Sequence, residues 1–162
     1  MSARDWLRNT RGEWYVLGQG ALAVLVLLAP IIDGKARSSY PDGVTATVAI
    51  GCILIALGFA FAALGALGLG RHVSPFPRPK HDAQLVETGV FAVVRHPIYT
   101  GLSLLALGYS LLWASVAALV ATVALIIFLD MKSRREERWL EEKFDAYARY
   151  KARVRRLVPL IY

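Results

Sequence analysis

The run Arg95-His96-Pro97 has the residue types to bind a charged ligand, and it stands where a basic segment meets an apolar stretch. Proline suits the first turn of a helix and holds the preceding residue extended. His96 would then lie just before a helix N-terminus, beside a guanidinium and free backbone N–H groups, where a carboxylate or phosphate could bind. The alternative is structural: Arg95 pairs with lipid phosphate and His96 caps the helix.

A pair of carboxylates, Glu136 and Glu137, is the second candidate feature. The pair lies within the charged run Arg134–Arg138, where local ion pairs on a solvated helix could explain it. If the chain doubles back, the two carboxylates would face the Arg95–Pro97 turn across one pocket. Such a pocket would suit a zwitterionic ligand or one of mixed charge. Ionisable residues at the ends of membrane spans are more often functional than incidental.

Three long stretches must position these residues. The chain has 162 residues, of which 56% are hydrophobic, and Tyr15–Ile32, Val44–Gly70 and Pro97–Leu129 contain no charged residue. Each stretch is near or above the about 18–20 residues that a helix needs to cross a bilayer. We therefore predict an all-α integral membrane protein that forms a single membrane domain over residues 1–162.

The basic residues predict how the chain crosses the membrane. Lysine and arginine gather in the N-terminal segment, in the loop 70–96 and in the tail after residue 132, which places all three on the cytoplasmic side. Leu102–Leu129 must then cross and return, with a turn near Trp113–Ser115. As a single helix it would be about 42 Å long, too long to span without strong tilt. We predict four spans at 14–32, 44–69, 97–113 and 115–133, with both termini cytoplasmic.

The tail after Asp130 predicts an amphipathic cytoplasmic helix, because apolar residues from Leu140 to Val154 recur at helical spacing. We expect a cytoplasmic cofactor-binding part over 71–99 and 132–158. The net charge of +7 lies beside the spans. It therefore favours attraction to an anionic membrane leaflet over binding of nucleic acid. The expected location is the cell membrane of a prokaryote.

Other classes of site find little support. Three histidines without ligand spacing and the single cysteine Cys52 do not predict a metal site. The glycines near residue 68 follow a membrane helix rather than a strand, so they do not predict a Rossmann turn. A stripe of small residues in the second span indicates close helix packing, and a homodimer through this face is possible. The stripe consists of Gly51, Gly58, Ala62, Gly65 and Ala66.

Three segments together resemble the isoprenylcysteine carboxyl methyltransferase family, to which phospholipid N-methyltransferases are related. They are Leu85–Gly101 with its Arg-His-Pro-x-Tyr element, the pair Glu136-Glu137, and Phe144–Tyr150. The resemblance covers about residues 70–160 and is specific because the three segments occur together. It implies a membrane methyltransferase that binds S-adenosylmethionine outside any Rossmann fold. The methyl acceptor would be lipophilic: a prenylcysteine-like carboxylate or a phospholipid amine, from a membrane lipid or a lipidated substrate.

The resemblance also implies site residues, although it names no catalytic base. Substrate-binding candidates lie about a turn before the glutamate pair, where the family has arginine and this chain has Lys132, with Arg134 and Arg135 nearby. The implied cofactor contacts are Gln84, Leu85, Val86, Phe91, Arg95, His96, Pro97, Ile98, Tyr99, Glu136 and Glu137.

Two other functions compete with a methyltransferase. Membrane reductases of the sterol type, which use NADPH, carry a similar Arg-His-Pro-x-Tyr element but are generally larger. A non-enzymatic membrane subunit is the other alternative. The sequence leaves open whether oxygen, nitrogen or sulfur accepts the methyl group.

Overall fold

The computed structural model describes residues 9, 11–34, 45–159 and 161–162. Within these ranges the regular secondary structure is helical, and the one extended pairing is an isolated bridge between Val94 and Arg155. The prediction of an all-α fold is therefore confirmed. The helices are α2 (Glu13–Ile32), α3 (Thr45–Leu69), α4 (Pro97–Leu112), α5 (Val116–Lys143) and α6 (Tyr147–Arg153), with 3-10 turns η1 (Gly70–His72) and η2 (Gly89–Ala92).

Three of the helices, α2, α3 and α5, are long and apolar enough to cross a membrane. The fourth, α4, is apolar but has only 16 residues. Large apolar side chains such as Ile31 and Leu67 are exposed on the outside of the bundle, as contact with lipid requires. The chain is therefore a membrane protein. Four of the basic residues behind the predicted orientation, Arg4, Arg8, Lys35 and Arg37, lie outside the described residues.

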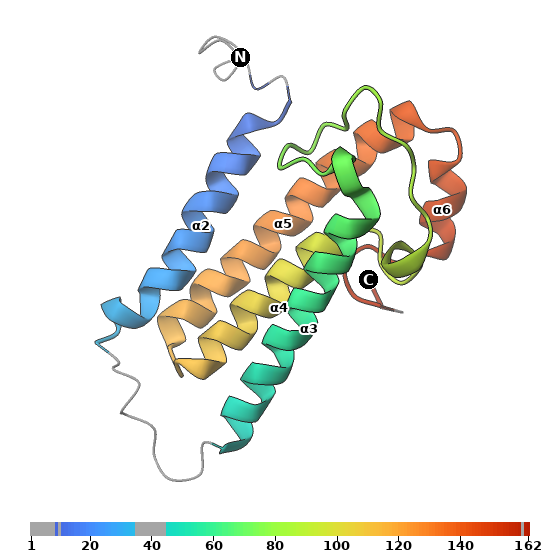
Figure 1. Ribbon diagram of the computed structural model, residues 1–162. Coiled ribbons are helices and arrows are strands. Elements are labelled where there is room, and N and C mark those ends of the chain that lie inside the picture. The colour runs from blue at the N-terminus through green and yellow to red at the C-terminus, as the bar shows by residue number, and fades with distance from the viewer. Residues whose placement is uncertain (1–8, 10, 35–44, 160) are drawn as a thin grey trace.

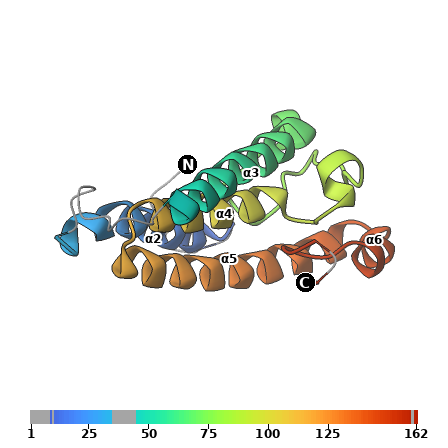
Figure 2. The same ribbon diagram turned by 90° about the horizontal axis from the view of Figure 1, so that it is seen from below.

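These four helices lie side by side, with α2 along α5 and α3 along α4 (Figures 1 and 2). The buried core forms where α2, α4 and α5 meet. It contains Val26, Ala106, Ala121, Leu125 and Leu129.

Glycines let α3 and α4 approach closely. A Cβ atom added at Gly58 would lie 2.8 Å from the carbonyl oxygen of Gly101, and one added at Gly101 would lie 2.6 Å from that of Gly58. Part of the small-residue stripe in the second span thus packs within the chain, as small residues do in membrane helices. A homodimer through this stripe stays a prediction.

The predicted hairpin between the last two spans is present. The chain turns at residues 113–115, and the Ser115 hydroxyl caps α5 by accepting a hydrogen bond from the N–H of Ala118 at 3.0 Å. The same hydroxyl donates to Asp33 at 2.5 Å, which ties the turn to the end of α2. The N-terminus of α4 and the C-terminal half of α5 therefore lie at the same end of the bundle.

The segment after Asp130 is divided differently from our prediction. We expected the last span to end at residue 133 and a separate amphipathic helix to follow. Instead α5 continues to Lys143, the backbone becomes extended at Phe144, and the short α6 begins at Tyr147. Figure 1 shows α6 folded back beside the segment that contains η2. Contacts of the tail with that segment outweigh the helical periodicity of its sequence.

Candidate functional site

The turn before α4 is held by the end of the chain. The N–H of Arg95 donates to the carbonyl of Arg155 at 2.8 Å, and the N–H of His96 donates to that of Arg156 at 3.1 Å. The Thr100 hydroxyl donates to the carbonyl of Leu157 at 2.7 Å. The tail thus holds the two residues that precede α4, and His96 forms no side-chain cap on the helix.

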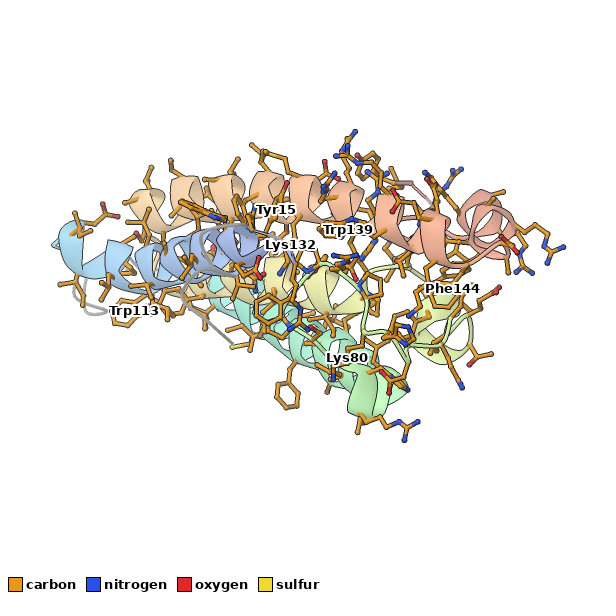
Figure 3. The ribbon with its side chains drawn as sticks, turned by 90° about the horizontal axis from the view of Figure 1, so that it is seen from above. Tyr15, Lys80, Trp113, Lys132, Trp139 and Phe144 are labelled. Atoms are coloured by element: carbon orange, nitrogen blue, oxygen red, sulfur yellow. The ribbon has the colours of Figure 1, made fainter. Side chains whose placement is uncertain are left out.

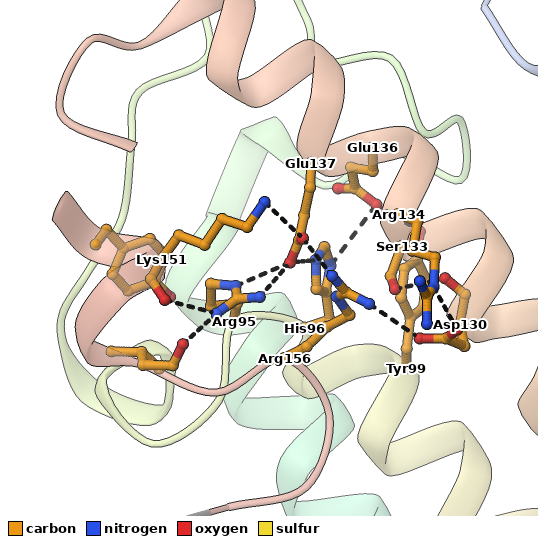
Figure 4. Close-up of polar contacts among 12 residues, drawn as sticks. Arg95, His96, Tyr99, Asp130, Ser133, Arg134, Glu136, Glu137, Lys151 and Arg156 are labelled. Carbon is orange, nitrogen blue, oxygen red and sulfur yellow. Dashed lines mark hydrogen bonds and ion pairs between the residues drawn. The ribbon is translucent and has the colours of Figure 1, made fainter. Parts of the chain in front are cut away.

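Glu137 lies at the centre of a buried ionic network (Figure 4). Its carboxylate accepts hydrogen bonds from Arg95 Nε at 2.8 Å and from Arg156 at 2.9 Å, and it lies 3.3 Å from His96 Nε2. Although burial opposes the charge of Arg156, its hydrogen bond to Glu137 raises its pKa. The network joins α5, the turn before α4 and the tail, so Glu137 fixes the relative positions of these three segments.

Glu136, by contrast, lies beside the aromatic face of α4. It accepts a hydrogen bond from the Tyr99 hydroxyl at 2.8 Å, and its Oε2 lies 3.8 Å from His96 Nδ1. The rings of His96 and Tyr99 are stacked, with centroids 5.4 Å apart and planes 7° from parallel. The predicted convergence of the two distant polar segments is therefore seen, but the two glutamates have different surroundings.

Lys132 is a buried cation in the same region, 2% exposed. Its ammonium group donates to Gln19 Oε1 at 2.6 Å and to the carbonyl of Pro75 at 2.9 Å. It also lies 5.1 Å from the centroid of the Tyr99 ring. Figure 3 shows it inside the bundle, among α2, α4 and α5. No carboxylate of the described residues forms a salt bridge with it.

Two tyrosines of α6 close the other side of the region. Tyr150 donates to the carbonyl of Phe91 at 2.7 Å. The hydroxyl of Tyr147 is buried and has no hydrogen-bond partner within the described part of the chain. Burial raises the pKa of both phenols, and the negative charge of Glu137 adds to the rise at Tyr147. Both side chains therefore stay protonated at neutral pH, and Tyr147 retains an unused donor.

These groups surround one cavity of about 310 Å³. This volume is at the lower end of the range for small-molecule sites, about 300–1,000 Å³. Of the site residues suggested by the sequence, eleven line it: Gln84, Leu85, Val86, Phe91, Arg95, His96, Pro97, Ile98, Tyr99, Lys132 and Glu136.

The other three suggested residues do not line this cavity. Glu137 lies behind it in the ionic network. Arg134 forms a salt bridge with Asp130 at 2.7 Å, and its side chain is 56% exposed. The Arg135 guanidinium lies 4.5 Å from the centroid of the Trp139 ring. Of the three basic candidates for substrate binding, only Lys132 lines the cavity.

Several lining residues were not singled out from the sequence. Gln19 is contributed by the first span, and no sequence signal connects it with a residue more than a hundred positions away. Tyr147 and Tyr150 belong to the tail segment that carried the resemblance, and this signal could have identified them. The remaining lining residues are Leu69, Val73, Ser74, Pro75, Leu102 and Leu140.

The chain is similar to known methyltransferases. The chain is 32% identical over 127 residues to a protein-S-isoprenylcysteine O-methyltransferase of Saccharomyces cerevisiae, covering 76% of this chain and 53% of that protein. It is 36% identical over 92 residues to a protein of the same name from Schizosaccharomyces pombe, covering 56% of this chain and 39% of that protein. The chain thus spans about half the length, or less, of these relatives. Both are from yeasts and do not bear on the expected prokaryotic source. The family model described as phospholipid methyltransferase matches residues 46–147, from α3 to the start of α6, and the chain belongs to this family.

Proposed function

We propose that this protein transfers the methyl group of S-adenosylmethionine to the carboxylate of a lipidated acceptor, such as an isoprenylated cysteine. The observation that carries the proposal is the pairing of opposite charges in one cavity. Glu136 provides a carboxylate beside aromatic rings, and Lys132 provides a buried ammonium group without a carboxylate partner among the described residues. The family and the names of the relatives support the reaction class.

The lining of the cavity fits S-adenosylmethionine. The ammonium group of the cofactor would find an acceptor in Glu136. The rings of Tyr99 and Phe91 would suit its adenine and its sulfonium, because aromatic faces attract cations. The hydroxyl of Tyr147 is a buried donor that lacks a partner within the described residues, and such groups are rare unless a ligand satisfies them.

When bound, the cofactor supplies an electrophilic methyl group. The residues of the chain then have to hold the acceptor in line and keep water out, because a carboxylate needs no base to accept a methyl group. Lys132 would bind the acceptor carboxylate. The buried network around Glu137 would keep His96 and the turn before α4 in place. Leu102 and Leu140 would provide apolar walls beside the acceptor.

Lys132 also discriminates between the two candidate acceptors, the carboxylate and a phospholipid amine. The description of the matching family favours that acceptor. A buried cation stabilises an anion next to it, because charges interact strongly where water is excluded. The same cation would repel the ammonium form of an amine. The carboxylate therefore suits this cavity better than the amine.

The expected orientation completes the proposal. With both termini in the cytoplasm, the cytoplasmic part formed by 71–99 and 132–158 would receive the soluble cofactor. A lipidated acceptor would reach the same cavity from the bilayer. This arrangement requires the cavity to lie near the cytoplasmic surface of the membrane, where the hairpin of α4 and α5 returns the chain.

The test is a transfer assay with the full chain in lipid nanodiscs and S-adenosylmethionine labelled in its methyl group. N-acetyl-S-farnesylcysteine and phosphatidylethanolamine are offered as acceptors in parallel. We expect base-labile label, typical of a methyl ester, on the farnesylcysteine. Label on phosphatidylethanolamine alone would favour the amine acceptor. Absence of label on both, together with binding of NADPH, would favour a reductase.

A further inference from the structure

Gln19, which contacts the Lys132 ammonium group, has no role assigned so far. The group has three N–H donors, and two are used by Gln19 Oε1 at 2.6 Å and by the carbonyl of Pro75 at 2.9 Å. One donor remains for a ligand in the cavity. Gln19 belongs to α2, and it too lines the cavity. The family model begins at residue 46, so Gln19 lies outside the matched region.

The hydrogen bond to Lys132 fixes the orientation of the Gln19 amide. An ammonium group only donates, so the oxygen of the amide must face it and the NH₂ group must occupy the other branch. That NH₂ group donates no hydrogen bond to the described residues. Gln19 therefore presents two polar functions: an oxygen that holds the Lys132 ammonium and a donor left for a ligand.

The packing of α2 on α5 sets this arrangement. Gly18 allows a close approach, since a Cβ atom added there would lie 2.5 Å from the ring of Phe128. The ring of Tyr15 lies against the same Phe128 ring, with centroids 5.8 Å apart. Gln19 follows Gly18, and Lys132 lies one helical turn after Phe128. Across this close contact the long side chain of Lys132 reaches Gln19, with Nζ 2.6 Å from Oε1.

We infer that Gln19 is an acceptor-binding residue, and that its amide NH₂ and the Lys132 ammonium together bind one carboxylate of the acceptor. The inference rests on the proposed function and assigns part of the acceptor site to the first span. A carboxylate can accept hydrogen bonds on both oxygens, so two donors from adjacent side chains orient it as well as bind it. The ammonium form of an amine has no acceptor for these two donors, and a neutral ester lacks the negative charge that strengthens both hydrogen bonds.

The test compares Gln19→Glu and Gln19→Ala with the wild-type chain in nanodiscs, with N-acetyl-S-farnesylcysteine as acceptor. Gln19→Glu keeps the shape but places a carboxylate where the donor was, so it should pair with Lys132 and repel the acceptor. We expect KM for the acceptor to rise about 10-fold in Gln19→Ala, as for loss of a hydrogen bond to a charged group, and further in Gln19→Glu. The dissociation constant of S-adenosylhomocysteine should stay within about twofold.

A second measurement separates binding from a structural role. The carboxamide of the same farnesylcysteine, used as a competitive inhibitor, lacks the negative charge, and Gln19→Glu should leave its inhibition constant nearly unchanged. The control Leu17→Ala alters an exposed apolar residue of the same helix and should match the wild type in every constant.

Each remaining outcome would overturn the role of Gln19, the proposed function, or both. Wild-type KM in both Gln19 variants, with methylation intact, overturns the inference and leaves the proposed function standing. Weaker binding of S-adenosylhomocysteine in parallel with the acceptor shows a structural role and also overturns it. A wild-type chain that binds S-adenosylhomocysteine but does not methylate the farnesylcysteine overturns both the inference and the carboxylate acceptor. Failure of the wild type to bind S-adenosylhomocysteine overturns the proposed function itself.

Discussion

Replacing Glu137 with glutamine tests whether the buried ionic network holds the site together. The side chain is 2% exposed, and its partners Arg95 and Arg156 are 6% and 14% exposed. Removing one partner of a buried ion pair costs about 3–5 kcal/mol, because the remaining charge is left uncompensated. Glutamine keeps the shape and can still accept one hydrogen bond. We therefore expect the free energy of unfolding to fall by about 3 kcal/mol, at the lower end of this range.

The effect should extend to the cavity, because Glu137 also contacts His96. We expect Glu137→Gln to weaken binding of S-adenosylhomocysteine even under conditions where the variant is fully folded. The assays are reversible unfolding in mixed micelles and calorimetric titration of the folded protein. Both are compared with the wild type at the same detergent concentration.

A matched control lies one helical turn further along α5. Glu141 forms a salt bridge with Lys151 at 2.7 Å, but both side chains are 40% exposed. Such an exposed pair contributes about 0–1 kcal/mol to the free energy of unfolding, so Glu141→Gln should have little effect on stability or binding. Equal losses of stability in Glu137→Gln and Glu141→Gln would refute the argument that burial makes the network structurally important.

Three further predictions follow from single contacts. Tyr99→Phe removes a hydrogen bond to a carboxylate and should weaken binding of S-adenosylhomocysteine about 10-fold by calorimetry, with unchanged affinity as the contradictory result. Gly101→Leu places a side chain against the backbone of α3 and should lower the unfolding temperature. The control Gly20→Ala meets no atom within 4 Å and should leave the unfolding temperature unchanged. Equal unfolding temperatures for the two variants would show that the close approach of α3 and α4 is unimportant. Because folding raises the pKa of Tyr147 and Tyr150 above the ordinary 10.0, their contribution to stability is full below pH 10.0 and is lost as pH rises above it. Replacing both by phenylalanine should flatten this alkaline loss in pH-dependent unfolding, and an unchanged pH profile would contradict the assignment.

Much of the arrangement follows from sequence patterns that have a strong physical cause. Uncharged stretches of sufficient length predict the spans, and the positions of basic residues require the return at Trp113–Ser115. The hairpin then brings the turn before α4 and the glutamate pair to one end of the bundle. These inferences depend on hydrophobic length and charge, which act over many residues at once.

The details of the site depend on contacts that the sequence does not encode locally. Glu136 and Glu137 are adjacent, but successive residues of a helix point about 100° apart, so one faces the cavity and the other the ionic network. The rotation of α5 about its axis decides which of the two glutamates faces the cavity. The contact of Gln19 with Lys132 depends on how α2 packs on α5, and no local pattern predicts it.

In the tail, too, the local sequence pattern does not predict the observed secondary structure. Its apolar residues recur at helical spacing across Phe144, yet the chain leaves the helix there and α6 folds back. The tail then supplies the carbonyl groups that hold the N–H groups of Arg95 and His96. Tertiary contacts of this kind outweigh local periodicity, as they commonly do for short helices.

The central claim is that one cavity, formed by the turn before α4 and by α5, binds the cofactor. Calorimetric titration of the purified full chain with S-adenosylhomocysteine tests it most directly, with His96→Ala and Glu136→Ala measured beside the wild type. Our account predicts saturable binding by the wild type and no measurable binding by either variant, although both retain the helical content and cooperative unfolding of the wild type. Wild-type affinity in both variants would contradict it.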